Sequence, residues 1–332
     1  MNFVLTEMTL LRYFIPLVIE GNRRGLKSEF YILEKSTGKY NCVSFYPKIV
    51  KEVCEKYNIG LNSISTLNKS EDLTFYIEDS GIGHHHIDNP AKKICLTYQH
   101  DFARKLESGR TAYEERLIKY YDNIILPSEY FAKFYGTLSN KNLYLGSPKY
   151  DTEIDKSLVI EKYNINESKN ALVVLPKTRD FMKANIPQII SDIESMGYYP
   201  IMKTRGKDSI RNFYNMKNYF EDTEWFPHTT MELIEASDIV INFGSTTVKE
   251  CVMLEKPVLN FPIKPHEKQY LMPFLYEYDY SRELDPNYKT KEFNDTFMYL
   301  VEKNHKEDFK KAKDSHLFDF KSSPKILDEV LK

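Results

Sequence analysis

The sequence has few cysteines and no long apolar run, and both absences narrow the class of protein. Its 4 cysteines form no CxxC pair, which argues against a zinc knuckle or a disulfide framework. The apolar N-terminal stretch is interrupted by Glu7, Arg12 and Glu20 and no small-residue cleavage site follows it. It therefore fits neither a secretory signal nor a membrane span, and we expect a cytoplasmic protein.

An excess of charge of one sign is also lacking. The formal net charge of -2 creates no field that would recruit nucleic acid, so we expect no nucleic-acid partner. With 332 residues the chain is long enough for two ordinary domains, each with its own core. Two domains are therefore the starting expectation.

Apolar strand-like runs alternate with helical patterns along the chain, which is typical of parallel α/β sheets. The alternation pauses in a polar stretch at 149–169 and then restarts. We predict an N-terminal Rossmann-like domain over residues 1–150 and a C-terminal Rossmann-like domain over 151–290. Helices over 291–332 would pack on these two doubly wound parallel sheets.

The most informative motif is a turn of small residues, Gly244-Ser245-Thr246-Thr247. It follows an apolar strand-like run over 239–243 and opens a helical pattern. Such a turn offers backbone N–H groups and hydroxyls, and the dipole of the following helix favours negative charge. We predict that it binds the phosphates of a nucleotide diphosphate.

Glu250 lies one turn inside that helical pattern. Its carboxylate is placed to accept hydrogen bonds from the ribose hydroxyls of the same nucleotide. The T-x-x-E spacing from Thr247 to Glu250 is also the signature of a capping box, in which both side chains serve only the helix. Both interpretations stay open.

Cationic residues follow two predicted strands of the second domain. Lys177 and Arg179 lie in the run PKTRD, and Lys203 and Arg205 lie in the run MKTRGKD. The planar guanidinium group suits a diphosphate, which it can bind through two parallel hydrogen bonds. We predict that at least one of these cations binds the phosphates of this nucleotide. With so many cationic side chains no metal or cofactor is required.

His100 is the candidate general base. It follows an apolar run over 93–98, which would place it at the carboxyl edge of the first sheet, where open α/β folds bind ligands. Its ordinary pKa lies near neutral pH, as proton transfer requires. Asp101 is the candidate carboxylate that orients His100, with a helix cap as its alternative role.

Three adjacent histidines, His84, His85 and His86, form the most conspicuous local cluster. Neighbouring side chains point in different directions and cannot all face one metal ion, so we predict no metal site. We assign His84 and His85, together with Asp79, to an acceptor-binding loop. A plain loop is the alternative.

Several segments resemble, in order, those of the CDP-glycerol glycerophosphotransferase family of teichoic-acid enzymes. The run ASDIVINFGSTTVKECVMLEKPVLNF resembles the donor-binding segment of GT-B glycosyltransferases and, more closely, of this family. ICLTYQHDFARKLE resembles the family's strand that ends in a catalytic His-Gly pair. NIILPSEYFAKFY resembles the strand and helix that follow this pair in the family. LYLGSPKYD resembles the family's G-x-P-R-x-D segment, and VVLPKTRD resembles its P-T-x-R-D loop. Asp101 stands in place of the family's glycine, and Lys203-Thr204 stands where the family has a His-Pro pair.

The resemblance implies a GT-B fold, two Rossmann-like domains facing across a cleft, with His100 catalytic. The N-terminal domain, 1–150, would be the acceptor domain, and the C-terminal domain, 151–290, would be the nucleotide-donor domain. The nucleotide-activated donor would be a substrate and not a cofactor. It implies transfer of a sugar or glycerol-phosphate group from a nucleotide-activated donor to a polysaccharide or lipid-linked acceptor in cell-surface glycan synthesis. Basic residues that include Arg23, Arg24 and Lys27 would suit a peripheral contact with the inner face of a membrane. Two alternatives stay open: an isomerase similar to UDP-N-acetylglucosamine 2-epimerase, and a GT-B binding protein without catalytic activity.

Overall fold

The computed structural model shows a chain folded into two compact units. The first comprises Met1–Thr152 and Ser315–Lys332, and the second comprises Glu153–Asp314. The structure describes residues 1–32, 43, 46–77, 90–97, 119–135, 140–166, 169–204, 218–222, 225–263, 271–318 and 320–332, without the side chains of 133–135. Each unit has a parallel sheet of its own.

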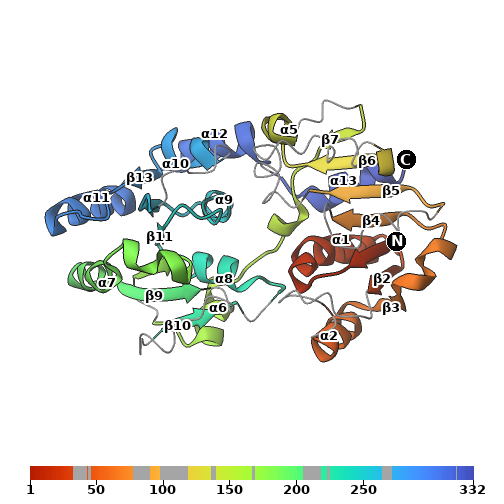
Figure 1. Cartoon of the computed structure of the whole chain (residues 1–332), viewed down its shortest axis with the longest axis horizontal. Coiled ribbons are helices and arrows are strands. Elements are labelled where there is room, and N and C mark those ends of the chain that lie inside the picture. Colours follow the sequence, from red (N-terminus) through yellow and green to blue (C-terminus); the bar gives the residue numbers. More distant parts are fainter. Residues whose placement is uncertain are drawn as a thin grey trace. The chain divides into compact units, whose positions relative to one another are not determined.

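The first unit contains a seven-stranded sheet in the order β3-β2-β1-β4-β5-β6-β7 (Figure 1). Its strands are β1 (Asn2–Leu5), β2 (Ser28–Ile32), β3 (Ile59–Ser63), β4 (Thr74–Ile77), β5 (Lys93–Leu96), β6 (Asn123–Leu126) and β7 (Asn142–Tyr144). All neighbouring strands are parallel. The strand order reverses between β1 and β4, so the carboxyl ends of these two strands form the topological switch point, where doubly wound folds bind ligands.

Helices of the first unit cover this sheet. They are α1 (Leu11–Arg23), α2 (Pro47–Tyr57), α5 (Glu129–Tyr135) and α13 (Ser322–Val330), with short 3-10 turns η1 (Met8–Leu10), η3 (Ile64–Lys69) and η5 (Pro148–Tyr150). The helix α1 contacts β2, η5 and α13. Phe14 of α1 lies 5.3 Å from the ring of Phe3 in β1, which stacks on Phe75 of β4 at 5.1 Å. Burial of each such ring stabilises the unit by about 1.5–3 kcal/mol.

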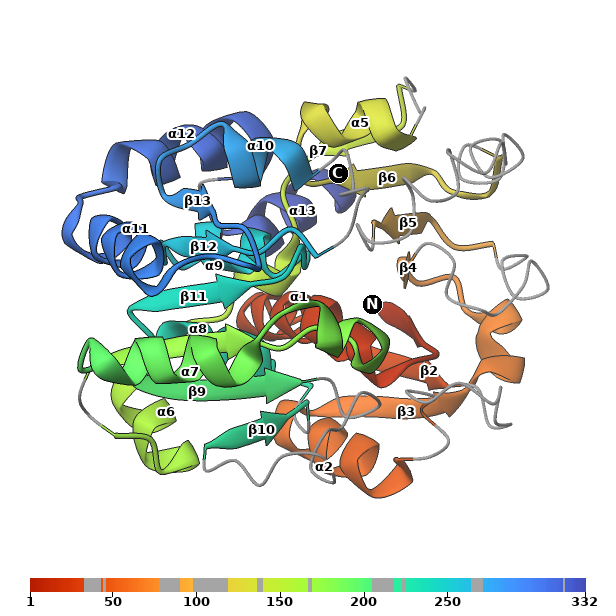
Figure 2. The same cartoon turned by 60° about the vertical axis from the view of Figure 1, so that its left-hand side comes forward.

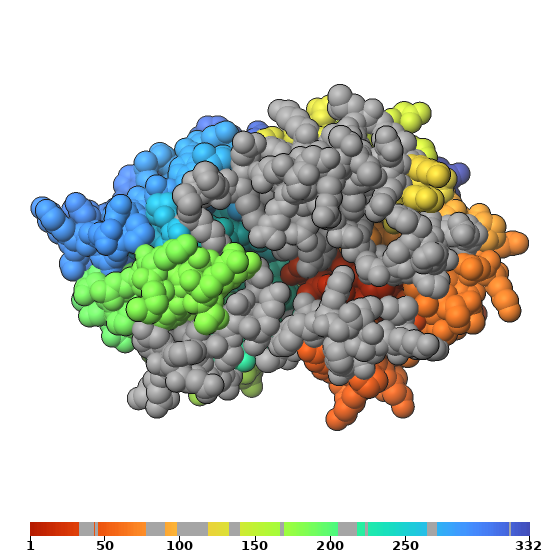
Figure 3. Space-filling view, in the orientation of Figure 1, coloured from red at the N-terminus to blue at the C-terminus, as the bar shows by residue number. Residues whose placement is uncertain are grey.

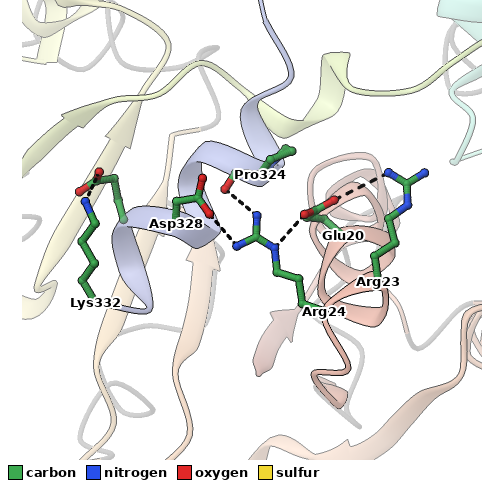
Figure 4. A network of polar contacts seen from close by, with 7 residues as sticks. Glu20, Arg23, Arg24, Pro324, Asp328 and Lys332 are labelled. Carbon is green, nitrogen blue, oxygen red and sulfur yellow. Dashed lines mark hydrogen bonds and ion pairs between the residues drawn. The ribbon is translucent and has the colours of Figure 1, made fainter.

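Arg24 joins the C-terminal helix to α1 (Figure 4). Its Nε donates to Glu20 at 2.8 Å, one terminal nitrogen donates to Asp328 at 2.8 Å, and the other donates to the carbonyl oxygen of Pro324 at 3.1 Å. Arg24 therefore serves the attachment of α13, whereas Arg23 keeps an exposed side chain beside Glu20. A basic membrane-contacting surface stays a prediction.

The second unit contains a six-stranded parallel sheet in the order β10-β9-β8-β11-β12-β13. Its strands are β8 (Asn170–Val174), β9 (Tyr199–Thr204), β10 (Tyr219–Glu221), β11 (Ile239–Asn242), β12 (Val258–Asn260) and β13 (Ser281–Glu283). This order repeats that of the first six strands of the other sheet. The switch point of the second unit therefore lies between β8 and β11.

Helices cover both faces of the second sheet. They are α6 (Lys156–Tyr163), α7 (Ile186–Ser195), α8 (Thr229–Glu235), α9 (Val248–Met253), α10 (Met272–Tyr276), α11 (Thr290–Glu302) and α12 (Lys306–His316), with the 3-10 turn η6 (Thr178–Lys183). The helices α7 and α11 contact each other on one face (Figure 2), where Val173, Met202 and Ile241 belong to one apolar core. Because side chains alternate along a strand, the residue that follows each of these three faces the opposite side of the sheet.

The structure confirms the two doubly wound sheets, but the sequence pattern misses several short elements. The strands β3, β10 and β13 lie at or near sheet edges, and β10 and β13 each have three residues. The polar stretch 149–169, predicted as a connection, contains the helix α6, whose N-cap Asp155 accepts from two backbone N–H groups. In α6 the apolar residue Leu158 is exposed, so no amphipathic pattern marks the helix.

Among the described residues, no helix is both long and apolar enough to span a membrane. The described cysteines, Cys54, Cys95 and Cys251, are buried free thiols. Burial raises the pKa of Cys54 to about 11, so this thiol stays protonated at neutral pH.

Candidate functional site

The turn between β11 and α9 leaves the second sheet at its switch point. Gly244 adopts a φ of 61°, a left-handed conformation that residues with a Cβ adopt only at a cost. Ser245 is half-buried, and Thr246 and Thr247 are each 9% exposed. The predicted small-residue turn is therefore present, with its hydroxyl groups at the carboxyl edge of the sheet.

Two buried asparagines hold this turn in place. Oδ1 of Asn260, the last residue of β12, accepts from Nδ2 of Asn242 at 2.9 Å and from the N–H of Gly244 at 3.0 Å. Oδ1 of Asn242, the last residue of β11, accepts from the N–H of Ser245 at 3.3 Å. Sequence reasoning missed both residues. Their signal is an asparagine at the same point of two successive runs, INF and LNF.

The capping box between Thr247 and Glu250 is not formed, so that interpretation is wrong. Thr247 already has helical dihedral angles, and its side chain makes no capping hydrogen bond. Its N–H instead donates to Oγ of Ser245 at 3.4 Å, and the two hydroxyl oxygens are 3.0 Å apart. Glu250 is buried in the first turn of α9. Its role as a ribose ligand stays a prediction.

Thr246 keeps its polar groups available. Neither its backbone N–H nor its Oγ1 forms a hydrogen bond with any residue that the structure describes. The helix α9 spans Val248–Met253 and is shorter than the sequence pattern suggests. Anion binding here would therefore depend on the donors of the turn more than on the dipole of a long helix.

Lys203, one of the predicted phosphate ligands, is buried at the end of β9. Its Nζ forms an ion pair with Oδ1 of Asp222 at 2.7 Å. The same carboxylate oxygen accepts from Oγ1 of Thr230 at 3.3 Å and lies 3.5 Å from Nε2 of His228. Sequence reasoning missed Asp222 and His228, because their proximity to Lys203 arises from the pairing of β9 with β10 and from the start of α8. Phosphate binding by Lys203 stays a prediction.

Lys177 and Arg179 follow β8, on the other side of the same switch point. Lys177 is half-buried, and the side chain of Arg179 is 71% exposed. Nε of Arg179 lies 3.5 Å from Oδ2 of the buried Asp180, whose other oxygen lies 2.8 Å from Nζ of Lys183. Asp180 thus anchors the base of this loop, and the guanidinium group of Arg179 stays accessible to an anionic ligand.

The remaining candidates lie outside the described residues: Asp79, His84, His85, His100, Asp101 and Arg205. The strands that precede Asp79 and His100, β4 and β5, are parallel neighbours in the first sheet. In the part of the chain that the structure covers, no group of three or more His, Cys, Asp or Glu side chains is arranged to hold a metal ion. Independence of metal stays a prediction.

Two Rossmann-like units with doubly wound parallel sheets of seven and six strands define the GT-B fold, and solved structures with this fold match the whole chain. The sequence itself matches no protein-family model and no curated protein.

Three solved structures illustrate the similarity. The glycotransferase of kitacinnamycin shares 10% identity, with 99% of this chain and 97% of the other covered and a TM-score of 0.58. The Methanocaldococcus jannaschii UDP-GlcNAc 2-epimerase, in complex with UDP-GlcNAc and UDP, shares 13% identity, with coverage of 99% and 98% and a TM-score of 0.60. The wall teichoic acid polymerase TagF shares 12% identity, with coverage of 86% and 84% and a TM-score of 0.55. At these identities the similarity shows the fold alone.

Proposed function

We propose that the protein is a GT-B transferase that uses a nucleotide-activated donor, and that the second unit holds the donor's diphosphate at the Gly244–Thr247 turn. The observation that carries this proposal is the state of Thr246, whose N–H and Oγ1 have no partner among the described residues. Asn242 and Asn260 hold the turn in one geometry, so its donors are oriented before a ligand arrives. The exposed Arg179, across the switch point, adds positive charge.

In this proposal Glu250 accepts hydrogen bonds from the ribose hydroxyls, and the first unit binds the acceptor. His100 removes the proton of the acceptor hydroxyl, Asp101 orients His100, and the loop with Asp79, His84 and His85 contacts the acceptor. The donor is a substrate and the reaction needs no metal or cofactor, because cationic side chains stabilise the departing nucleotide.

We propose a sugar or a glycerol phosphate as the transferred group, and a glycan or lipid-linked acceptor at the inner face of a membrane. The sequence segments that resemble CDP-glycerol glycerophosphotransferases support this choice, as does the fold shared with a wall teichoic acid polymerase. A His100→Ala variant should keep nucleotide affinity and lose turnover, and sustained turnover would contradict the assignment of the base.

An isomerase is the second candidate, because a UDP-GlcNAc 2-epimerase has the same fold at a TM-score of 0.60. The products distinguish the two reactions. A transferase releases free nucleotide in step with modification of the acceptor, whereas a nucleotide-sugar isomerase that retains the nucleotide converts the donor without an acceptor.

A calorimetric titration with CDP, UDP, GDP and dTDP tests the nucleotide site. Thr246→Val removes the hydroxyl and keeps a β-branched side chain of similar shape. A hydrogen bond to a charged group contributes about 1.5–3 kcal/mol, so the variant should bind the preferred nucleotide roughly 10- to 100-fold more weakly. Thr296→Val in α11 makes the same chemical change outside the Gly244–Thr247 turn and should bind normally. Wild-type affinity in Thr246→Val would contradict the proposed site.

A further inference from the structure

A pocket of about 500 Å³ opens at the amino edge of the first sheet, where β2 and β3 begin. It is lined by residues from the end of α1 to the start of β2, and by Asn58 and Gly60 at the start of β3. The helix α2, which ends beside Asn58, lies at the surface of the unit (orange in Figure 3). The volume of the pocket is typical of small-molecule sites. Because the strands are parallel, this edge is opposite to the switch point at the carboxyl ends of β1 and β4.

The carboxylate of Glu29 lies at the wall of this pocket and uses only one of its oxygens. Oε2 accepts from Nδ2 of Asn62 at 2.8 Å and from the hydroxyl of Tyr31 at 3.3 Å. Oε1 has no hydrogen-bond partner among the residues that the structure describes. Two donors thus orient the carboxylate, and Oε1 remains a charged acceptor for a ligand.

Gly60 leaves the space beside Glu29 open. A Cβ at this position would lie 3.2 Å from Cγ of Glu29 and 3.7 Å from its Oε1. The first distance is shorter than an ordinary carbon–carbon contact, so a larger residue would fill the space and push the glutamate side chain aside. Glycine inside a strand often marks the close approach of a ligand. The strand β3 therefore has a gap in its row of side chains at the pocket.

Three further polar side chains line the pocket. Ser28 is 3% exposed, and its Oγ is buried without a hydrogen-bond partner in the described part of the chain. The side-chain amide of Asn58 likewise has no partner among the described residues. Nδ2 of Asn22 donates to the carbonyl oxygen of Tyr57 at 2.9 Å, which leaves its Oδ1 as an acceptor. Each of these side chains can form a hydrogen bond with a ligand.

The charge of the pocket narrows the class of ligand. Among the described lining residues, Lys27 is the single cation and Glu29 the single anion. A polyanion is bound by clustered cations, and a metal ion by several oxygen ligands, and the pocket has neither set. A carboxylate, two amides and a hydroxyl instead match a ligand with several hydroxyl groups, because each hydroxyl can donate and accept. This is the chemistry of a sugar.

We propose that this pocket binds one sugar unit of the acceptor glycan, with Oε1 of Glu29 accepting from a sugar hydroxyl. Ser28 and Asn58 pair with further hydroxyls, and Gly60 gives the sugar ring room. The strand β2 has five residues, so the pocket lies roughly 15 Å from the carboxyl edge, where the reacting end of the acceptor is proposed to bind. The pocket holds the glycan and performs no chemistry on it. The choice of the acceptor as the source of the sugar rests on the proposed function.

Saturation-transfer NMR of the full chain with glucose, galactose, mannose and N-acetylglucosamine tests the pocket. Glu29→Gln exchanges a charged acceptor for a neutral amide and should bind the preferred sugar roughly 10-fold more weakly. Gly60→Val fills the space beside Oε1 and should abolish binding, while its β-branched side chain suits a strand. Glu52→Gln is the matched control, because it removes an exposed carboxylate of α2 outside the pocket, and it should bind like the wild type. Circular dichroism checks folding, and if Glu29→Gln does not fold, Gly60→Val decides the test.

A tetrasaccharide of the preferred sugar separates a glycan from a free sugar as the source. It should bind at least as tightly as the monosaccharide, and Gly60→Val should lose both. The inference is overturned if none of the four sugars binds, if Glu29→Gln and Gly60→Val bind unchanged, or if only the monosaccharide binds.

The donor site is tested separately from this pocket. Saturating nucleotide should not displace the sugar, and Thr246→Val should bind the sugar normally; displacement would overturn the inference. Sugar binding that persists in a protein that binds no nucleotide would contradict the proposed donor site and leave this pocket intact.

Discussion

Replacing Asn260 with alanine tests how the turn at Gly244 is held. The change removes the one oxygen that accepts from Nδ2 of Asn242 and from the N–H of Gly244, at 2.9 and 3.0 Å. Both asparagines are fully buried, so no bulk water replaces the lost acceptor. Each buried donor left without a partner costs about 1–3 kcal/mol. After partial relaxation we expect a loss of roughly 2–4 kcal/mol in the free energy of unfolding of the second unit.

Nucleotide affinity should fall as well, because Gly244 and the residues after it lose their fixed geometry. Thermal unfolding and calorimetric titration with the preferred nucleotide measure the two effects. Asn170→Ala is the matched control, since Asn170 is also buried in this sheet and its Nδ2 donates two hydrogen bonds, to Asn166 and Ala236, but at the amino end of β8. It should lower stability and leave nucleotide affinity unchanged. Equal losses of affinity in both variants would refute the reasoning.

Three further predictions concern single residues of the second unit. Gly244→Ala should lower the free energy of unfolding by about 1–2 kcal/mol, because φ is 61° at this position. Urea unfolding measures this loss, and an unchanged midpoint would contradict the left-handed conformation of the turn. Asp222→Asn leaves the buried ammonium of Lys203 without its 2.7 Å counter-charge and should lower stability by about 3 kcal/mol, with partial recovery in the double variant that also carries Lys203→Met. Burial lowers the pKa of His305 below its ordinary value of 6.5, because the folded protein favours the neutral imidazole. The contribution of neutral His305 to stability is therefore complete above pH 6.5, and it is lost as pH falls through the folded-state pKa. Urea unfolding at about pH 7.5 and about pH 5.5 should show this loss, and His305→Gln should reduce it; an equal loss in the variant would refute the assignment to His305.

The sequence predicts the fold well where a strand is buried on both faces. The run ALVVL gives β8 and the run IVIN gives β11, because strands covered by helices on both sides are apolar at nearly every position. The edge strand β13 has the sequence SRE, with two exposed residues. Its conformation depends on hydrogen bonds to β12, which local sequence does not encode.

The sequence predicts the candidate nucleotide site only in part, for a similar reason. The Gly244 turn has a local signature, a strand followed by small residues and a helix, and it is found where that signature lies. The hydrogen bond between Asn242 and Asn260 requires β11 and β12 to be neighbours in one particular register. The ion pair of Lys203 with Asp222 likewise requires β10 to lie beside β9. The T-x-x-E signature failed because Ser245, two residues before Thr247, supplies the acceptor instead.

The return of Ser315–Lys332 to the first unit determines the order in which the two units can be completed on the ribosome. The helix α13, which Arg24 attaches to α1, is translated only after all of Glu153–Asp314. At ordinary rates of synthesis this interval lasts on the order of 10–30 s. The second unit, made of one continuous segment, can therefore finish folding first, while the earlier-synthesised unit still lacks a helix of its core. Newly made chains would thus expose the unpartnered surface of α1 to chaperones and proteases for most of their synthesis.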